Sequence, residues 1–247
     1  MMSKVPAEES VAIIIPALDE EAVIGRVVES IRGVLDPGAI VRIIVVDNGS
    51  ADRTAAVAAA AGAEVVSEPT RGYGQACAAG VAAADGSEIL VLLDGDGSDD
   101  PADLAAILGP LRSGEADLVV GVRARSERGA MTVQQIFGNR LACLAIHLIH
   151  GTRINDLGPF RAIRRRHLLL LEMDEMTYGW STEMVVKSLR ARLRYREVEV
   201  SYRRRTGVSK VGGSVLGSLR AGRSILGTVA RHSRWVPASQ ARPIVDG

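Results

Sequence analysis

Short apolar runs alternate with longer, helix-like stretches through the first half of the chain. The apolar runs are rich in Val, Ile and Leu, as expected of strands that are covered on both faces. They occupy residues 11–15, 41–46, 63–66, 89–93 and 117–121. The helix-like stretches lie between them, at residues 20–35, 54–61, 75–84 and 101–111. This alternation is typical of βαβ units and predicts an α/β domain with a doubly wound, mostly parallel sheet and helices on both faces.

The second half of the chain has a less regular pattern. It predicts helices over residues 131–149 and 178–193, strands over 160–163 and 195–202, and a basic, Gly-containing loop over 203–213. Apolar residues recur at helical spacing again over 214–229. We therefore expect a single domain over residues 1–230, with halves at 1–121 and 122–213, and a C-terminal amphipathic helix and tail over 214–247.

Composition and charge exclude several classes of protein. The 247 residues carry a formal net charge of +1 and only 3% are aromatic, which argues against a nucleic-acid-binding surface. The two cysteines, Cys77 and Cys143, lie in helix-like stretches and predict no disulfide framework. No apolar run is long enough to span a bilayer, and charged residues lie near the start where a signal peptide needs an apolar core. We therefore expect a cytoplasmic protein.

Acidic residues are concentrated between Asp85 and Asp103, a stretch with seven carboxylates and no Lys or Arg. Within it, Asp94 and Asp96 directly follow an apolar run, at the strand end where α/β sheets bind ligands. A divalent cation that bridges a diphosphate needs one or two carboxylates and open positions for phosphate oxygens. Asp96 is the expected ligand of Mg²⁺ or Mn²⁺, and Asp94 reaches the ribose or the ion and its water. An acidic turn that caps the next helix is the alternative.

Two other strand ends and a glycine turn hold candidate nucleotide contacts. Asp47 is placed to accept a hydrogen bond from a base, although an ordinary strand-to-helix turn has the same composition. Pro16 lacks a backbone donor and stiffens the wall, and Glu20 is either a nucleotide contact or a partner of the helix dipole. The expected nucleotide contacts are Pro16, Ala17, Asp19, Glu20, Asp47, Gly49, Arg71, Gly72, Gln75 and Asp94.

Four motifs follow one another in a familiar order: Pro16-Ala-Leu-Asp19-Glu20, Val46-Asp47-Asn48-Gly49-Ser50, Arg71-Gly72-Tyr-Gly74 and Asp94-Gly-Asp96. Together they resemble the family 2 inverting glycosyltransferases, especially the branch similar to dolichyl-phosphate mannose synthase and other polyprenyl-phosphate sugar synthases. The resemblance covers residues 11 to about 226. It implies a GT-A fold, a divalent metal ion and a UDP- or GDP-linked hexose donor. Asp19, Asn48 and Ser98 depart from the family pattern, which leaves the base contacts and the sugar open.

Arginines in the second half resemble the acceptor-side motifs of the same branch, which implies a polyprenyl or dolichyl phosphate as acceptor. Guanidinium groups bind phosphate oxygens through paired hydrogen bonds. Among these motifs the basic loop resembles the branch most strongly, because Gly207, Ser209 and Lys210 follow Arg203, Arg204 and Arg205 at the family's spacing. A solvated basic edge is the alternative. The residues expected at the acceptor phosphate are Arg123, Arg140, Arg204, Arg205, Ser209 and Lys210.

Glu183 lies where many family 2 enzymes have a carboxylate that deprotonates an acceptor hydroxyl. A phosphate acceptor is already an anion and needs no base. Glu183 is therefore interpreted equally well as a charged residue at the start of a helix. A second function therefore stays open, which is transfer to the hydroxyl of a soluble acceptor with Glu183 as base. The expected catalytic residues are Asp96, Glu183, Arg123 and Arg140.

The C-terminal segment offers a way to reach a lipid without spanning the membrane. Its apolar residues share a helical stripe and its arginines add positive charge, which suits peripheral contact with the inner face of a membrane. A helix packed on the domain has the same pattern. The residues concerned are Val211, Val215, Leu219, Leu226 and Val229, with Arg220, Arg223 and Arg231. The run from Arg164 to Arg166 has no motif beside it and is interpreted as surface or membrane-facing charge.

Overall fold

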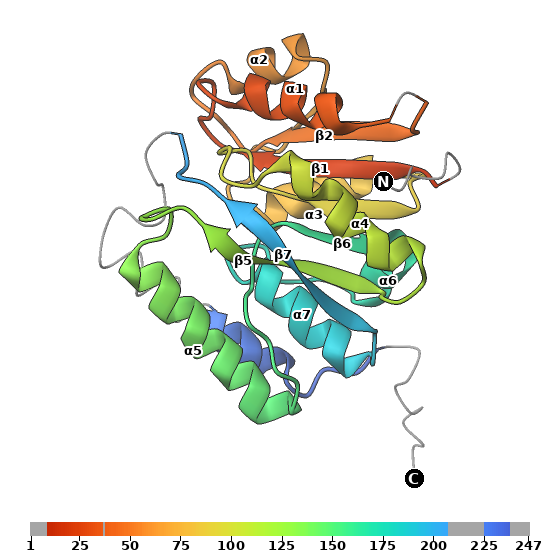
Figure 1. Ribbon diagram of the computed structural model, residues 1–247, viewed down its shortest axis with the longest axis vertical. Helices are drawn as coiled ribbons and strands as arrows, with labels where there is room; N and C mark the ends of the chain where they lie inside the picture. Colours follow the sequence, from red (N-terminus) through yellow and green to blue (C-terminus); the bar gives the residue numbers. More distant parts are fainter. Residues whose placement is uncertain (1–8, 37, 207–224, 238–247) are drawn as a thin grey trace.

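The computed structural model describes residues 9–36, 38–206 and 225–237, and its centre is one seven-stranded sheet (Figure 1). The strand order is β3-β2-β1-β4-β6-β5-β7. The strands are β1 (Val11–Ala17), β2 (Val41–Asp47), β3 (Glu64–Ser67), β4 (Ile89–Leu92), β5 (Leu118–Ser126), β6 (Arg161–Arg164) and β7 (Tyr195–Tyr202). The helices are α1 (Ile24–Val34), α2 (Thr54–Ala60), α3 (Tyr73–Ala83), α4 (Leu104–Arg112), α5 (Val133–His150), α6 (Arg165–Leu170) and α7 (Trp180–Arg190), with a 3₁₀ turn at Pro101–Asp103.

The expected mostly parallel sheet is confirmed, and it contains one antiparallel strand. Strands β3, β2, β1 and β4 are parallel neighbours, and β5 and β7 form a second parallel pair. Strand β6 lies between these two groups and runs antiparallel to both β4 and β5. Because β6 is antiparallel to both neighbours, β5 runs in the same direction as β4, so the first five strands are parallel as predicted. The sequence did not predict where β6 inserts, because a four-residue strand carries no local signal of its partners and its pairing is decided by long-range packing.

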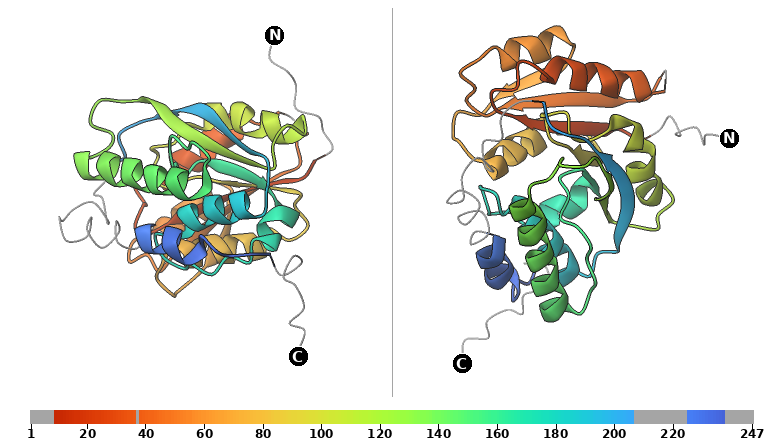
Figure 2. Two further views of the ribbon diagram at one scale, coloured as in Figure 1. Left: turned by 90° about the horizontal axis from the view of Figure 1, so that it is seen from below. Right: turned by 60° about the vertical axis from the view of Figure 1, so that its left-hand side comes forward.

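Both faces of the sheet are covered, which explains why its central strands are apolar at every position. In β1, Ile13 and Ile15 face a cluster built with α1 and α4, whereas Ala12 and Ile14 face a cluster built with α3 and α7. Successive side chains of a strand point to opposite faces, so each face of β1 needs its own apolar set. Figure 2 shows the helices on the two sides of the sheet.

Helix ends follow the signals in the sequence. At α5, the Thr132 side chain accepts from the N–H of Gln135 while the Gln135 side chain accepts from the N–H of Thr132, a capping box. The helix ends at Gly151, whose φ of 70° lies in the left-handed region that favours glycine. Asp100 caps the turn that starts at Pro101 by accepting from the Ala102 N–H. Helix α6 was not predicted, because its six residues are too few for a periodic signal.

Part of the predicted C-terminal helix is packed on the domain. Residues 225–232 are helical, Val229 is buried in the cluster beneath α7, and Arg231 forms an ion pair with Glu175 at 3.3 Å. Of the two alternatives for this segment, Val229 therefore follows the helix packed on the domain and not the exposed interfacial stripe. Residues 207–224 and 238–247, which carry the rest of that prediction, lie outside the described residues. Among the described helices, none has the length and apolar character needed to cross a bilayer.

The basic run at the end of β6 is not a free patch. The Arg164 guanidinium donates to Glu9 Oε1 at 3.0 Å and to the Leu111 carbonyl at 2.8 Å. Arg165 forms an ion pair with Asp85 at 3.0 Å. Acidic partners distant in sequence therefore neutralise the half-buried Arg164 and Arg165, whereas Arg166 is exposed, as predicted for surface charge.

Candidate functional site

A cavity of about 370 Å³ lies at the carboxyl ends of β1, β2 and β4. This edge of an open α/β sheet is where ligands bind, as the strand-end motifs predicted. Its walls come from the loops after these strands, the start of α3 and the basic segment after β7. The lining residues are Pro16, Ala17, Leu18, Glu20, Asn48, Arg71, Gly72, Tyr73, Ala76, Asp94, Gly95, Asp96, Tyr178 and Arg205.

Three carboxylates, Asp94, Asp96 and Asp99, lie together in the loop after β4. The Asp94 N–H donates to Asp99 Oδ2 at 3.0 Å. Asp96 Oδ1 accepts from the backbone N–H of Ser98 at 2.9 Å and also from the Ser98 hydroxyl. These hydrogen bonds fix the loop so that Asp94 and Asp96 both line the cavity while Asp99 supports them from behind.

The acidic loop fits a divalent cation. Asp94 Oδ1 and Asp99 Oδ1 are buried and have no hydrogen-bond partner among the described residues, and a buried unpaired carboxylate is costly. Burial, and then the charge of Asp96, raise the pKa of Asp94 to about 7, against the opposing effect of a hydrogen bond from Tyr73. Carboxylate oxygens at an open cavity are the ligands that Mg²⁺ and Mn²⁺ prefer. Asp94 and Asp96 are the residues that would hold such an ion.

Arg205 points into this cavity and faces its carboxylates. Its guanidinium lies 3.2 Å from Glu20 Oε1 and 3.4 Å from Asp96 Oδ2. The backbone secures this placement, because the Arg203 N–H donates to the Ser98 carbonyl at 2.8 Å and the Thr206 N–H donates to the Asp96 carbonyl at 3.2 Å. The basic segment after β7 therefore runs beside the acidic loop. Arg205 was expected at the acceptor phosphate, and its position favours the donor side instead.

Asn48 shapes the wall formed by the loops after β2 and β3. Its amide donates to the carbonyls of Glu68 at 2.9 Å and Thr70 at 2.7 Å, and its Oδ1 accepts from the Gly72 N–H at 2.9 Å. Arg71 is exposed and donates to the Gly49 carbonyl at 2.8 Å. The departure from the family pattern at position 48 thus has a clear structural role, since an amide can donate and accept at once whereas a carboxylate cannot.

Four of the expected nucleotide contacts, Asp19, Asp47, Gly49 and Gln75, do not line the cavity formed by the described residues. Asp47 Oδ1 accepts from the Ser50 N–H at 3.2 Å, and Asp19 Oδ1 accepts from the Ala51 N–H at 2.7 Å. Both carboxylates hold the turn after β2 in shape. Their contact with a nucleotide remains a prediction.

The cavity is also lined by two tyrosines, Tyr73 and Tyr178, which the sequence motifs did not single out. Tyr73 is the unnamed residue of the glycine turn, and its hydroxyl hydrogen-bonds to Asp94. Tyr178 comes from a distant loop that reaches α3 because Gly74 lacks a side chain. A Cβ at Gly74 would collide with the carbonyl of Glu175. The position of Tyr73 inside a motif was a usable signal, whereas that of Tyr178 depends on tertiary packing.

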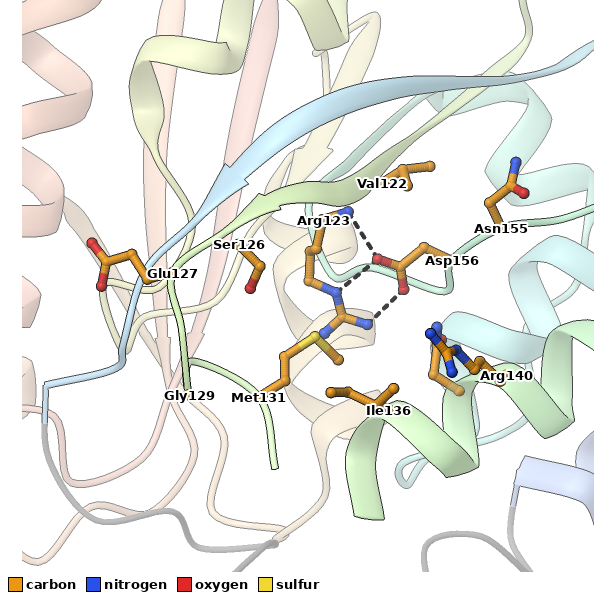
Figure 3. Close-up of a pocket in the computed structure, with 11 residues that line it drawn as sticks. Val122, Arg123, Ser126, Glu127, Gly129, Met131, Ile136, Arg140, Asn155 and Asp156 are labelled. Carbon is orange, nitrogen blue, oxygen red and sulfur yellow. Dashed lines mark hydrogen bonds and ion pairs between the residues drawn. The ribbon is translucent and has the colours of Figure 1, made fainter. Parts of the chain in front are cut away.

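A second cavity of about 300 Å³ is lined by two of the predicted acceptor arginines, Arg123 and Arg140 (Figure 3). Arg123 extends from β5 and is held by Asp156, whose Oδ2 accepts from the Arg123 N–H at 2.9 Å and from Nε at 2.8 Å, and whose Oδ1 accepts from Nη2 at 2.6 Å. The guanidinium also lies over the Tyr202 ring, 5.1 Å from its centroid. The bidentate pair fixes Arg123, so this residue forms a rigid cationic wall.

Arg140 comes from α5 and borders the same cavity, but it is exposed and makes no hydrogen bond or ion pair with the described residues. Arg204 approaches the cavity rim, where its guanidinium donates to the Arg128 carbonyl at 3.0 and 2.8 Å beside Gly129. Arg203 instead pairs with Asp100. Ser209 and Lys210 lie outside the described residues. Arg140 is therefore the most available cation at this cavity.

Glu183 lies away from both cavities. It is 0% exposed, and its Oε1 lies 2.6 Å from Lys187 Nζ. Its carboxylate accepts from the N–H groups of Asp174 at 2.9 Å and Glu175 at 2.8 Å. Burial raises the pKa of Glu183, while Lys187 and these N–H groups oppose the rise. Glu183 also lies close to Asp174 and His232, and the Lys187 ammonium supplies positive charge beside these two carboxylates.

Three comparisons with known proteins agree on one family. The model of "Glycosyl transferase family 2" matches residues 12–169. An uncharacterized glycosyltransferase of Mycobacterium tuberculosis is 39% identical over 218 residues, which is 87% of this chain and 95% of the relative. A dolichyl-phosphate hexose transferase of Haloferax volcanii is 32% identical over 216 residues, covering 85% of this chain and 91% of the relative. Among solved structures, glucosyl-3-phosphoglycerate synthase of M. tuberculosis with Mn²⁺, UDP-glucose and glycerol 3-phosphate superposes with a TM-score of 0.72 at 27% identity. The superposition covers 94% of this chain and 83% of that one.

Proposed function

Because this chain belongs to glycosyl transferase family 2 and has the GT-A fold, we propose that it transfers a hexose from a nucleoside-diphosphate hexose to a polyprenyl phosphate. The observation that carries the lipid acceptor is the juxtaposition at α5. There the arginine-lined cavity of Figure 3 opens beside a helix whose apolar side chains are exposed. The similarity to a dolichyl-phosphate hexose transferase over most of both chains supports the same acceptor class.

The donor is proposed to bind in the cavity at the ends of β1, β2 and β4. Asn48 and the glycine turn would border the nucleoside, and Asp94 and Asp96 would hold Mg²⁺ or Mn²⁺ against the diphosphate. The ion, when bound, neutralises charge that develops on the leaving diphosphate. Arg205 adds a second positive charge at the same place. The solved relative with Mn²⁺ and UDP-glucose supports this donor class and this type of cofactor.

The acceptor phosphate is proposed to bind between Arg123 and Arg140. Arg123 is fixed by Asp156, and Arg140 can move to meet the ligand because no described residue holds it. Two guanidinium groups orient a phosphate oxygen toward the anomeric carbon. That oxygen forms the new bond on the face opposite the departing diphosphate, so the configuration at the anomeric carbon inverts. The anionic nucleophile needs no general base.

A soluble acceptor is the second candidate, because solved relatives of similar fold carry phosphoglyceric acid or glycerol 3-phosphate. For transfer to the hydroxyl of a soluble acceptor, Glu183 was the expected base. The full burial of Glu183 and its pairing with Lys187 argue against proton transfer from an acceptor in either cavity. A phosphate-bearing soluble acceptor would still use Arg123 and Arg140, so the two candidates differ in the rest of the acceptor and not in how its phosphate is bound.

Replacing Arg140 with Ala is expected to lower kcat/KM for the acceptor by about 10- to 100-fold, because a charge-assisted hydrogen bond to phosphate contributes about 1.5–3 kcal/mol. Donor affinity, measured by calorimetry with the nucleotide sugar and Mn²⁺, should not change. Arg26→Ala, which removes an exposed arginine on α1, is the matched control. An equal loss of donor affinity in Arg140→Ala would assign this residue to the diphosphate instead.

The identity of the donor is open to a direct screen. A ligand that binds only the folded protein adds about 2.7 kcal/mol to the free energy of unfolding at a concentration of about 100 times Kd. The melting temperature rises as a consequence. We expect one nucleoside-diphosphate hexose to stabilise the protein in the presence of Mn²⁺ and to lose most of this effect in chelator. Stabilisation by every such compound alike, independent of base and ion, would contradict a specific donor site.

A further inference from the structure

Helix α5 carries a large exposed apolar surface. Of the thirteen large apolar side chains that are exposed among the described residues, seven belong to this one helix. The most exposed are Val133 at 79%, Leu148 at 75%, Phe137 at 68% and Leu144 at 52%. Spacings of four, seven and four residues place them on one side of the helix. An apolar stripe of this length on a soluble surface marks an interaction site. We call these four residues the α5 stripe.

The α5 stripe lies directly beside the proposed acceptor site. Arg140 is three residues after Phe137 and four before Leu144, so it occupies the neighbouring row on the same helix. Arg140 and Ile136 line the cavity of Figure 3, and Arg140 also lines a further cavity of about 490 Å³ with His147. Along α5, the row with Ile136 and Arg140 therefore faces the proposed acceptor cavity, while the adjacent row, the α5 stripe, is apolar and exposed. Within the stripe, Leu144 also borders the cavity of about 490 Å³.

The segment of the chain that contains α5 carries only positive charge. Of the two carboxylates that line the cavity beside it, Asp156 is paired with Arg123. From Arg128 to Arg153 there is no Asp or Glu, and the stretch contains three arginines and two histidines. The second of these arginines, Arg140, lies near the middle of the helix. An apolar stripe bordered by cations and free of carboxylates suits a surface that is apolar inside and anionic outside.

We propose that α5 docks on an anionic lipid bilayer, with the α5 stripe buried among the acyl chains and Arg140 at the level of the headgroup phosphates. This inference rests on the proposed lipid-phosphate acceptor. An amphipathic helix lying in the interface buries its apolar face about 5–10 Å deep. A polyprenyl phosphate embedded in the same bilayer presents its phosphate at that level, so docking delivers the phosphate to the cavity that contains Arg123 and Arg140.

A second copy of the chain is the competing occupant, and the charges argue against it. A two-fold contact joins the same patch on both subunits. Pairing two α5 helices through the α5 stripe would therefore bring Arg140 and its copy to the edges of one interface. The helix itself has no carboxylate to pair with either of them.

The test is vesicle binding by the full chain with the double substitution Phe137→Glu/Leu148→Glu. Neither side chain lines a cavity described above. Co-sedimentation with vesicles of equal parts phosphatidylcholine and phosphatidylglycerol should weaken by about tenfold or more, since binding scales with buried apolar area. The matched control is Val34→Glu/Ile40→Glu, which places the same charges at two other exposed apolar positions, 45% and 57% exposed, near the end of α1. Figure 1 shows α1 at the opposite end of the molecule from α5.

A second readout separates this inference from the proposed function. With a short-chain, water-soluble polyprenyl phosphate, the Phe137→Glu/Leu148→Glu variant should turn over like the wild type. With a long-chain acceptor embedded in vesicles it should lose about tenfold or more in rate. Unchanged vesicle binding by this variant would overturn the docking inference. A wild-type dimer in analytical ultracentrifugation that the variant dissociates, with vesicle binding retained, would overturn it in favour of a subunit interface. Absence of turnover with either lipid acceptor would instead count against the proposed function.

Discussion

Replacing Asp96 with Asn is expected to lower the rate of sugar transfer by about 10²–10³-fold, the effect of removing one preorganised electrostatic group from an active site. The side chain of Asn has the same shape and its Oδ1 still accepts from Ser98, so the loop after β4 should keep its fold. What is lost is the negative charge that would hold Mg²⁺ or Mn²⁺ at the donor diphosphate. The measurement is kcat at saturating nucleotide sugar, with circular dichroism to verify folding.

The control for this substitution is Asp85→Asn, which neutralises an exposed carboxylate of the same acidic stretch and should leave the rate within about twofold, as for surface positions. The wild-type chain should also lose activity in chelator and regain it with added Mn²⁺. Full wild-type turnover in chelator would show that Asp96 does not act through a metal ion.

Replacing Lys187 with Met should destabilise the protein by about 3–5 kcal/mol, because removal of one partner from a buried ion pair leaves the other charge uncompensated. Lys187 is 1% exposed, lies 2.6 Å from Glu183 and donates to the Glu172 carbonyl at 2.6 Å. Chemical denaturation with urea measures the change in the free energy of unfolding. The double substitution Glu183→Gln/Lys187→Met should recover part of the loss, since no unpaired charge is then buried.

The same experiment decides the role of Glu183. If this residue only anchors α7, Glu183→Gln will also lower stability, and the folded fraction will retain most of its turnover with a lipid-phosphate acceptor. A Glu183→Gln variant that is as stable as the wild type and has lost turnover by about 10²-fold or more would identify Glu183 as a general base. That result would favour the soluble hydroxyl acceptor.

The parts of the fold that could be predicted were those with a local physical cause. Strands such as β1 are apolar at consecutive positions because both faces are covered, and α5 begins and ends with capping signals that can be read from Thr132, Gln135 and Gly151. The insertion of β6 between β4 and β5 could not be predicted, because strand pairing between residues about 70 positions apart depends on packing and not on local pattern.

The candidate site shows the same division. Strand-end motifs led to Asp94, Asp96 and the glycine turn, since the carboxyl ends of neighbouring parallel strands meet at one edge. The position of Arg205 beside the acidic loop could not be predicted, because it depends on backbone hydrogen bonds that align the segment after β7 with the loop after β4. Glu183 looked like a base from its position in a motif, and only the structure reveals its buried partner.

The identity of the glycosylated product is the most direct test of the central claim. The purified chain, Mn²⁺ and the nucleoside-diphosphate hexose selected by the thermal screen would be incubated with a short-chain polyprenyl phosphate and 3-phosphoglycerate together. Mass spectrometry would then identify which acceptor has gained a hexose. We expect the hexose on the polyprenyl phosphate, with the anomeric configuration inverted relative to the donor. A product formed on 3-phosphoglycerate alone would contradict the proposed acceptor and assign the arginine cavity to a soluble phosphate ester.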